Sequence, residues 1–478
     1  MDSSAAPDLP PRHTALGFTG LAASVVAGVI AASCGLKQPP DTTAIQKEAM
    51  PSVAVPAQWT ASGAAAGAVS GNWMAGFHDD ELMAIVVEAI AHNPNLQVAA
   101  TRVEQARLYA QLAGARLWPS VDFLARGGGK LSGDQSGVQG AVLTANWELD
   151  LWGRVRYGRS AAAADAASAE ADFEYARQSL AAQVAKAWFL ATEAGLQADI
   201  TRRTIHDSEE LVRLAQTRST IGVGNDEDVY VASASLGTYR DALRQIELAQ
   251  EQARRAIELL VGRYPAGTTT VSPQLPGQPD AVPAGLPSEL LERRPDVVAA
   301  ERRIAAAFNR VHEAKAARLP AISLTTGLST ISSELFVLKD HDNPTWNAGA
   351  SLLMPIFRGG ALKRQVEIRT AEQKQAVASY ADVGMRAFGE VEAALSAEIA
   401  ARQREAILTE TLGHTQRALD IVRTQFKVGS TDLRFVTQRQ LALEATEAAL
   451  LRVQAEQRVQ RVNLHLALGG SFAVPKNP

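Results

Sequence analysis

The sequence predicts a mainly α-helical protein that also contributes strands to a transmembrane β-barrel, and three observations support this fold class. Long stretches are rich in alanine, whereas aromatic residues make up only 5% of the 478 residues. The same order of segments occurs twice along the chain. Each copy contains two segments of about ten residues in which apolar and polar side chains alternate, which is the length of a membrane-spanning strand. Together these features favour two tandem repeats of long helices and membrane strands.

The repeat is visible first in prolines that bracket a helical run. Asn93-Pro94 opens a segment that ends at Trp118-Pro119, and Arg294-Pro295 opens one that ends at Leu319-Pro320. The two prolines are 25 residues apart in both copies. Because proline is favoured in the first turn of a helix, each opening proline predicts a helix start.

Two strand-like segments follow each closing proline, at residues 120–125 and 138–149 and at residues 321–329 and 346–357. Tryptophans lie near their ends, where the interfacial aromatic girdle of a membrane protein would place them. A soluble hairpin with core tryptophans is the alternative interpretation. The alternating residues are Val121, Phe123, Ala125, Ile322, Leu324, Thr326, Leu328, Trp346, Ala348, Ala350 and Leu352, and the tryptophans are Trp118, Trp147, Trp152 and Trp346.

Two long helical stretches then follow in each copy, at residues 157–220 and 229–260 and at residues 363–428 and 433–468. A helix of about 64 residues with a rise of 1.5 Å per residue is roughly 95 Å long. No ordinary globular domain accommodates such a helix. In each copy, one glycine lies between the two helical stretches and another follows the second stretch. Each glycine of the first copy has its counterpart 207 positions later in the second copy. They are Gly222 and Gly429 at the interruptions, and Gly262 and Gly469 at the ends.

The long helices also carry a sustained 3-4 spacing of apolar and small residues. This spacing is typical of a coiled-coil seam, so we expect the helices to pack against partners along their length. The first seam is Leu236, Tyr239, Leu243, Ile246, Gln250, Ala253, Ile257 and Leu260; 207 positions later come Leu443, Thr446, Leu450, Val453, Gln457, Gln460, Leu464 and Ala467; a third is Leu412, Thr415, Leu419, Val422 and Phe426.

The only cysteine, Cys34, follows a stretch typical of a secretory signal. Residues 14–33 carry no charge, come after Arg12 and end in small residues. Residues 31–34 resemble a bacterial lipobox, in which the cysteine is acylated and becomes the mature N-terminus, although Ala31 is less usual there than Leu, Val or Ile. An uncleaved membrane helix with an incidental cysteine is the alternative. No cofactor is expected apart from this covalent lipid, and by resemblance to bacterial lipoproteins Gly35 favours sorting to the outer membrane.

The chain is thus expected to have six parts. Pro, Ala and Ser are frequent after Cys34, which predicts a tether with little structure of its own, and prolines mark the linker between the repeats. In order, the parts are a lipoprotein signal peptide (1–33), the lipidated tether (34–71), the first repeat (72–262), the linker (263–287), the second repeat (288–470) and a C-terminal tail (471–478).

Four strands per chain predict an oligomer, because bacterial barrels need at least eight strands. An open sheet edge in lipid would leave backbone donors and acceptors unpaired. Symmetric copies would give eight strands in a dimer and twelve in a trimer. Side chains fill an eight-stranded barrel, whereas twelve strands leave a water-filled lumen. A conduit would therefore require a homotrimer.

Three strings of the sequence carry a family resemblance. They are residues 285–296 (GLPSELLERRPD), 147–156 (WELDLWGRVR) and 354–360 (MPIFRGG). The chain resembles the TolC-like outer-membrane efflux proteins, in the lipoprotein branch that serves resistance-nodulation-division pumps, from about Asn72 to Gly470. The resemblance implies a trimeric twelve-stranded barrel on a helical periplasmic tunnel, in the outer membrane of a Gram-negative bacterium. It also implies a periplasmic adaptor and an inner-membrane pump as partners, with drugs, ions or other small solutes passing outward.

The resemblance further points to the two helix-to-helix turns, residues 221–229 and 428–436, which would close the tunnel at its periplasmic tip. Family members often carry an aspartate ring nine residues after the glycine of the second turn. That position is Gln438 here, which argues against a simple cation-selective gate.

Other charges near the turns remain candidates for the gate. We expect Arg434 or Arg439 to pair with an acid of the first turn and help hold the tip closed. Exposed pairs contribute only about 0–1 kcal/mol each, although threefold symmetry would repeat them. Solvated turn charges without a gating role are an equal alternative. The acidic candidates are Asp226, Glu227, Asp228 and Asp432.

Composition and motifs argue against catalysis and nucleic-acid binding. The chain has 47 basic and 51 acidic side chains, a net charge of -4 and no basic stripe. None of the eight histidines has a metal-binding spacing, so no metal site is expected. Glu390 and Glu392 would fall on different helix faces, which argues against a carboxylate pair. The main alternative is a lipid-anchored periplasmic coiled-coil scaffold or adaptor without a pore.

Overall fold

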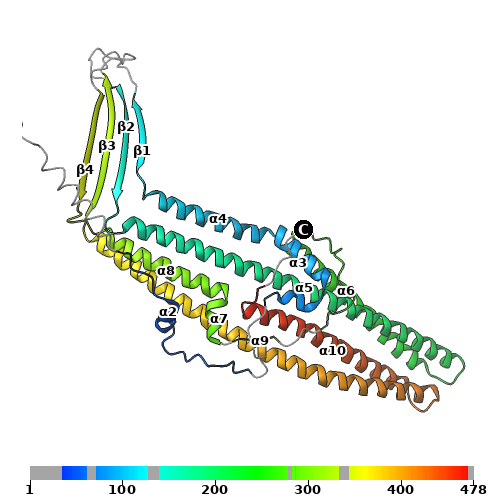
Figure 1. Ribbon diagram of the computed structural model, residues 1–478. Helices are drawn as coiled ribbons and strands as arrows, with labels where there is room; N and C mark the ends of the chain where they lie inside the picture. Colours follow the sequence, from blue (N-terminus) through cyan, green and yellow to red (C-terminus); the bar gives the residue numbers. More distant parts are fainter. Residues whose placement is uncertain are drawn as a thin grey trace, which may run out of the picture. The chain divides into compact units, whose positions relative to one another are not determined.

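Helices dominate the computed structural model, and the strands form one sheet among the residues that it describes (Figure 1). The chain divides into two compact units, of which one holds the sheet and the other most of the helices. Cys34, the predicted signal peptide and most of the predicted C-terminal tail lie outside the described residues. Those residues are 35–61, 71–126, 139–277, 282–285, 287–332 and 344–471.

The sheet is antiparallel, with its strands in chain order. It comprises β1 (Ser120–Arg126), β2 (Gln139–Leu149), β3 (Ala321–Ser332) and β4 (Pro344–Leu353). All four predicted strands are present. The predicted end of the last strand at residue 357 is wrong, since β4 stops at Leu353, before Pro355. Proline has no backbone N–H to donate to a strand ladder, which explains the earlier end.

The strand register gathers the predicted alternating residues on one face of the sheet. Phe123 lies opposite Leu143, which lies opposite Leu328 and then Trp346. Residues directly opposite one another in a ladder share a face, so the alternation builds a continuous apolar surface. Phe123 is 70% exposed and Trp346 is 79% exposed. The apolar face comprises Val121, Phe123, Ala125, Ala141, Leu143, Ala145, Trp147, Leu149, Ile322, Leu324, Thr326, Leu328, Trp346, Ala348, Ala350 and Leu352.

The opposite face of the sheet is mostly polar. Asp122, Thr144 and Asn347 share it, and the Thr325 hydroxyl donates to the Asn146 side chain over 3.1 Å. One sheet surface therefore suits a hydrocarbon environment and the other suits water.

Hydrogen bonds fix the base of the sheet to the start of the next helix. The indole N–H of Trp147 donates to the Leu117 carbonyl at 2.9 Å, and that of Trp152 donates to the Pro320 carbonyl at 2.7 Å. The Asp150 carboxylate accepts from the first backbone N–H groups of the helix that follows β2. An acid at this position compensates the positive end of the helix dipole.

The helices of the two halves correspond closely. Both ends of α9 lie 207 positions after the ends of α5 (361 − 154 and 427 − 220), and each helix has 67 residues. Proline opens α4 and α8 as predicted. The first half has α3 (Asp80–His92), α4 (Pro94–Ala115), α5 (Arg154–Thr220) and α6 (Asp226–Val261), and the second has α7 (Pro287–Arg293), α8 (Pro295–Ala316), α9 (Ala361–Lys427) and α10 (Leu433–Ala467).

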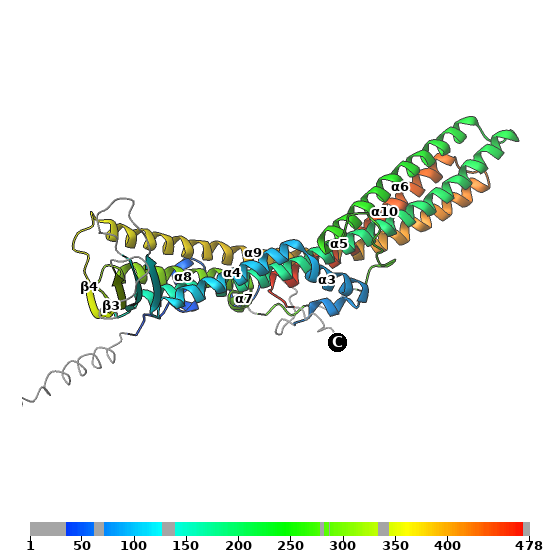
Figure 2. The same ribbon diagram turned by 90° about the horizontal axis from the view of Figure 1, so that it is seen from above.

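The side chains of the predicted seams on α6, α9 and α10 face neighbouring parts of the chain. Every residue of the three predicted seams is buried or half-buried, from Leu236 on α6 to Ala467 on α10. Figure 2 shows α5, α6, α9 and α10 side by side as they approach the two turns. Gln250 of the first seam recurs as Gln457 in the second seam. Buried Gln457 donates to the Ala401 carbonyl and to the Glu405 carboxylate on α9.

The prediction of little structure between residues 34 and 71 is wrong for its middle part. Residues Thr42–Ala49 form helix α2, because the Asp41 side chain accepts the Ala44 N–H at 2.7 Å and Ile45 is buried. Further on, the Glu392 carboxylate of α9 accepts from the backbone N–H groups of Thr60 and Ala61. Capping and tertiary contacts thus order a segment of low local propensity.

Buried polar side chains hold the predicted linker in place. The Glu258 carboxylate of α6 accepts from the backbone N–H groups of Gly267, Thr268 and Thr269 at 2.6–3.0 Å. Arg458 of α10 donates twice to the Pro276 carbonyl. Burial alone would raise the pKa of Glu258, but the donated hydrogen bonds lower that pKa from 4.5 to about 2.

We predict that Glu258→Gln lowers the free energy of unfolding by about 1–3 kcal/mol at neutral pH, because a donating NH2 group replaces one of the two buried oxygens that accept N–H groups. A lowered pKa stabilises the fold above pH 4.5, and this contribution disappears as the pH falls towards 2. Thermal denaturation at pH 7 and at low pH measures the effect. The matched control is Glu251→Gln on the exposed side of the same helix. An equal loss for both variants, or a loss independent of pH, contradicts the prediction.

Candidate functional site

The first helix-to-helix turn is a glycine-capped helix end. Gly222 has φ of 77°, and the backbone N–H groups of Val223 and Gly224 both donate to the Arg218 carbonyl. A left-handed glycine at this position satisfies the last carbonyls of α5. A Cβ on Gly224 would lie 2.9 Å from the Arg218 Cβ, so the tight turn also requires that glycine.

The second turn has the same design. Gly429 has φ of 79°, and the Ser430 N–H donates to the Gln425 carbonyl at 2.9 Å. The turn connects Lys427, the last residue of α9, to Leu433, the first of α10. The two glycines expected to interrupt the helices thus hold equivalent positions in the two halves.

The acidic candidates of the first turn belong to a helix and not to the turn itself. Asp226, Glu227 and Asp228 form the first turn of α6, so the expected start of this helix at residue 229 is corrected to Asp226. The Asn225 side chain caps the helix by accepting the Asp228 N–H at 2.8 Å. Acidic side chains favour a helix N-terminus, which explains the earlier start.

The basic candidates lie at the start of α10. Arg434 is 3.7 Å from Asp432 of its own turn, and both side chains are more than 60% exposed. Gln438 and Arg439 lie further along α10 and are exposed. In the described protomer Arg434 is therefore paired within its own turn. Its expected pairing with an acid of the first turn stays a prediction.

The acids of the two turns influence each other electrostatically. Burial raises the pKa of Asp228 above its ordinary value, and the carboxylates of Asp432 and Glu227 add to the rise. Arg218 and Arg434 oppose it. Charges from both turns thus share one electrostatic environment.

Arg218 is the residue at this site that the sequence reasoning missed. Its guanidinium donates to the Phe426 carbonyl at 3.1 Å and lies 4.7 Å from the centre of the Phe426 ring. The contact joins the last turn of α5 to the last turn of α9, in a cluster where Phe426 is 2% exposed. A basic residue four positions before the turn glycine, facing a seam aromatic, is the signal that could have identified it.

Apolar side chains project from both turns. Ile221 is 65% exposed, Val223 is 62% exposed and Val428 is 74% exposed. Exposed apolar groups concentrated at one end of a helical bundle suit a protein contact.

The other candidate groups have structural partners. Glu390 binds the buried Arg294, whereas Glu392 holds the segment after α2, so these two carboxylates serve different contacts. Among the residues that the structure describes, no three His, Cys, Asp or Glu side chains are grouped to hold a metal ion. In the same residues, no helix combines the length and apolarity needed to cross a membrane.

The family model for the outer membrane efflux protein matches residues 85–263 and 286–470, which is most of the chain. The chain belongs to the outer membrane efflux protein family. The TolC-like resemblance is thereby confirmed, and with it an outer-membrane location and an efflux class.

Curated relatives match over nearly their whole length. The cation efflux system protein CusC of Escherichia coli O6:H1 is 30% identical over 441 residues, which cover 89% of this chain and 94% of the relative. The pyoverdine export outer membrane protein OpmQ of Pseudomonas aeruginosa is 29% identical, covering 88% and 92%. The outer membrane protein OprJ of the same species is 30% identical, covering 84% and 86%.

Solved structures share the fold. A crystal structure of CusC superposes with a TM-score of 0.80 at 25% identity, covering 92% of this chain and all of that chain. The outer-membrane channel OprN gives 0.80 at 26% identity, covering 92% and 99%. The open state of the Neisseria gonorrhoeae MtrE outer membrane channel gives 0.79 at 27% identity, covering 92% and 98%.

We predict that Arg218→Ala loosens both turns, because it removes a cation–π contact of about 0.5–1 kcal/mol and a hydrogen bond of similar strength. Hydrogen–deuterium exchange should quicken at residues 221–225 and at residues 428–432. The control is Arg213→Ala, whose side chain pairs with Glu210 on its own helix. Unchanged exchange at the second turn in the Arg218 variant would show that the contact does not couple the turns.

Proposed function

We propose that this chain is the outer-membrane channel subunit of a tripartite efflux system and passively conducts small solutes or drugs from the periplasm to the exterior. Family membership supports the class of function. The observation that carries the proposal is the sheet, which has one continuous apolar face, one polar face and two outer strands. Family members are transport proteins, and we propose no catalytic residue and no cofactor besides the lipid.

The proposed assembly is a homotrimer whose sheets close one twelve-stranded barrel. In the order β1-β2-β3-β4, the outer edges of β1 and β4 lack a partner among the described strands. Unpaired backbone groups are not tolerated in lipid, so β1 of one copy would pair with β4 of the next. The polar face would then line a water-filled lumen. The two matched segments and the equal lengths of α5 and α9 support a chain built from two tandem repeats.

The long helices would continue the lumen as a coiled-coil tunnel through the periplasm. The seams of α6, α9 and α10 account for packing within one copy. The two turns would form the periplasmic tip, with Asp226, Glu227, Asp228, Asp432, Arg434, Gln438 and Arg439 as the candidate gate residues and Arg218 linking the turns within each copy. The glycines Gly222 and Gly429 would shape this tip.

The proposed partners are a periplasmic adaptor, an inner-membrane resistance-nodulation-division pump and outer-membrane lipid. Exposed Ile221, Val223 and Val428 offer an apolar surface for the adaptor. Two relatives carry names that state cation efflux and pyoverdine export. A passive duct of this kind would take its cargo from the pump that it serves.

We further propose that Cys34 carries the lipid anchor. The Lys37 N–H donates to the Tyr157 hydroxyl at 2.9 Å, close to the base of the sheet. Three residues of extended chain span at most about 11 Å, so a lipid on Cys34 would stay near that base. The anchor and the apolar sheet face would then enter the same membrane.

We expect purified protein to form trimers by native mass spectrometry and to give small, gated currents in a planar bilayer. A trimer supplies the twelve strands that leave a lumen, and a tip closed by two turns per copy limits the current. A monomer without conductance would instead favour the pore-free alternatives, a lipid-anchored coiled-coil scaffold or an adaptor.

A matched pair of lysine variants, measured in the same planar-bilayer recording, tests which face of the sheet contacts lipid. A lysine in place of Phe123 faces the lipid and costs about 2–4 kcal/mol near the bilayer midplane, so insertion and current should fall. A lysine in place of Asp122 faces the lumen, so current should persist with altered ion preference. Equal behaviour of Phe123→Lys and Asp122→Lys would contradict the assignment of the two faces.

A further inference from the structure

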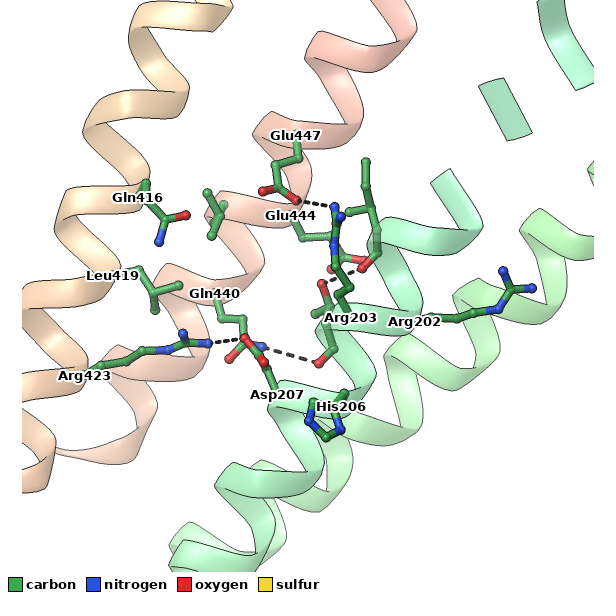
Figure 3. Close-up of a pocket in the computed structure, with 13 residues that line it drawn as sticks. Arg202, Arg203, His206, Asp207, Gln416, Leu419, Arg423, Gln440, Glu444 and Glu447 are labelled. Atoms are coloured by element: carbon green, nitrogen blue, oxygen red, sulfur yellow. Dashed lines mark hydrogen bonds and ion pairs between the residues drawn. The ribbon is translucent and has the colours of Figure 1, made fainter. Parts of the chain in front are cut away.

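The two halves of the chain contact each other through different helices, within the unit that holds most of the helices. The first half contributes α5, and the second half contributes α8 and α10. The Ser168 hydroxyl of α5 donates to the Ala299 carbonyl of α8 at 3.1 Å. Further along α5, Arg203 reaches Glu447 of α10 at 4.0 Å (Figure 3). A surface of α5 thus fits a surface of α8 and α10.

Both surfaces have a counterpart in the opposite half. Helix α9 lies 207 positions after α5, and α10 starts 207 positions after α6 (433 − 226). Helix α8 lies 201 positions after α4 (295 − 94 and 316 − 115). The counterpart of the α5 surface is therefore a surface of α9, and that of the α8 and α10 surface is a surface of α4 and α6.

The two counterpart surfaces are uncovered in the described protomer. Val98 of α4 is 49% exposed, whereas Ala299, which holds the equivalent place in α8, is 0% exposed. The same contrast holds along the other helices. The residues buried where the halves meet are Ser168, Thr204, Ala299 and Gln440, and their exposed counterparts, in the same order, are Gln375, Thr411, Val98 and Ser233.

The counterpart surfaces are complementary in shape at one position. Between the halves, the Thr201 hydroxyl of α5 donates to the Glu444 carboxylate of α10 at 3.3 Å. The counterparts of these residues are Leu408 of α9 and Gly237 of α6. A Cβ on Gly237 would meet no atom within 4 Å, so the glycine leaves room for a large side chain opposite.

The counterpart surfaces are also complementary in charge. Arg203 of α5 corresponds to Glu410 of α9, and Glu447 of α10 corresponds to Arg240 of α6. Both charges are reversed, so the two side chains remain an oppositely charged pair. A reversal at only one of the two positions would have put like charges opposite each other.

Both residues of this reversed pair can accept a further partner. Arg240 binds Glu209 of its own half at 2.8 Å, yet its side chain is 59% exposed. Glu410 lies 3.7 Å from His414 on the same helix, and its side chain is 79% exposed.

Three further ion pairs join the halves, and none of them has counterparts of like charge. Each of these counterpart pairs therefore permits the same contact. The ion pairs are Asp172 with Arg303, Asp207 with Arg423 and Glu193 with Arg452, and the counterparts, in the same order, are Ser379 with Arg102, His414 with Gln216 and Ala400 with Gln245.

We propose that the α9 surface of one copy binds the α4 and α6 surface of the next copy, with Glu410 facing Arg240. Leu408 would then lie over Gly237. The inference rests on the proposed homotrimer and assigns the helix contact that joins its copies. Because the two surfaces differ, the contact is head-to-tail, and such contacts can close into a ring.

A charge-reversal cycle tests the pair, with the midpoint temperature of trimer dissociation as the readout. Arg240→Glu and Glu410→Arg should each lower this midpoint by a few degrees, because each puts like charges opposite at every contact. The double variant should dissociate at a higher temperature than either single variant. Arg240→Glu combined with Asp420→Arg, which adds the same charge elsewhere on α9, should not recover. Equal midpoints in all variants, or additive losses in the double variant, would overturn the proposal.

Cross-linking of the full chain with a short bis-maleimide tests the register independently. Cysteines that replace Arg240 and Glu410 should give covalent trimers. Cysteines that replace Arg240 and Gln403, two turns away on α9, should not. A wild-type trimer with equal cross-linking of both pairs, or of neither, would overturn this contact alone. A wild-type protein without trimers would overturn the proposed homotrimer as well.

Discussion

The need to pair every backbone hydrogen-bonding group of the sheet is the constraint on which the rest of this protein depends. The register gathers the apolar side chains on one face, which suits lipid, but among the described strands β1 and β4 each leave an edge unpaired. Lipid offers no substitute for those missing hydrogen bonds. In the proposed homotrimer, closure would come from further copies, and the side-chain alternation would make the polar faces enclose the lumen.

The helices meet a different requirement, which is to remain parallel over great length while ending in sharp turns. Seam packing provides the first, because its residues are buried or half-buried throughout. Left-handed glycines provide the second at Gly222 and Gly429. Polar contacts add to this packing: Arg218 reaches Phe426 of the other half near the turns, and Glu258 and Arg458 hold the linker. Near the turns, a buried apolar cluster that includes Phe426 and Leu433 also joins the helices of the two halves.

Features set by local periodicity could be predicted from the sequence, and those set by tertiary contact could not. Alternation in residues 121–125 and 322–328 predicted the shared sheet face, because side-chain direction in a strand has period two. The first turn of α6 was missed, because a helix start depends on the Asn225 cap as well as on apolar spacing. Helix α2 was missed because its burial depends on distant helices. Arg218 was missed for the same reason, since its partner lies 208 positions away.

Closure of the sheet by copies of itself is tested most directly by cross-linking across the open edges. Residues that meet across an edge share a face, so a cysteine replacing Asp122 of β1 is paired in turn with one replacing Asn347, Gly349 or Ser351 of β4. Oxidation in membranes should give covalently closed trimers for at least one of these cysteine pairs. The control variant that carries only the β1 cysteine should give no such trimer. Products no larger than a single chain would contradict the account.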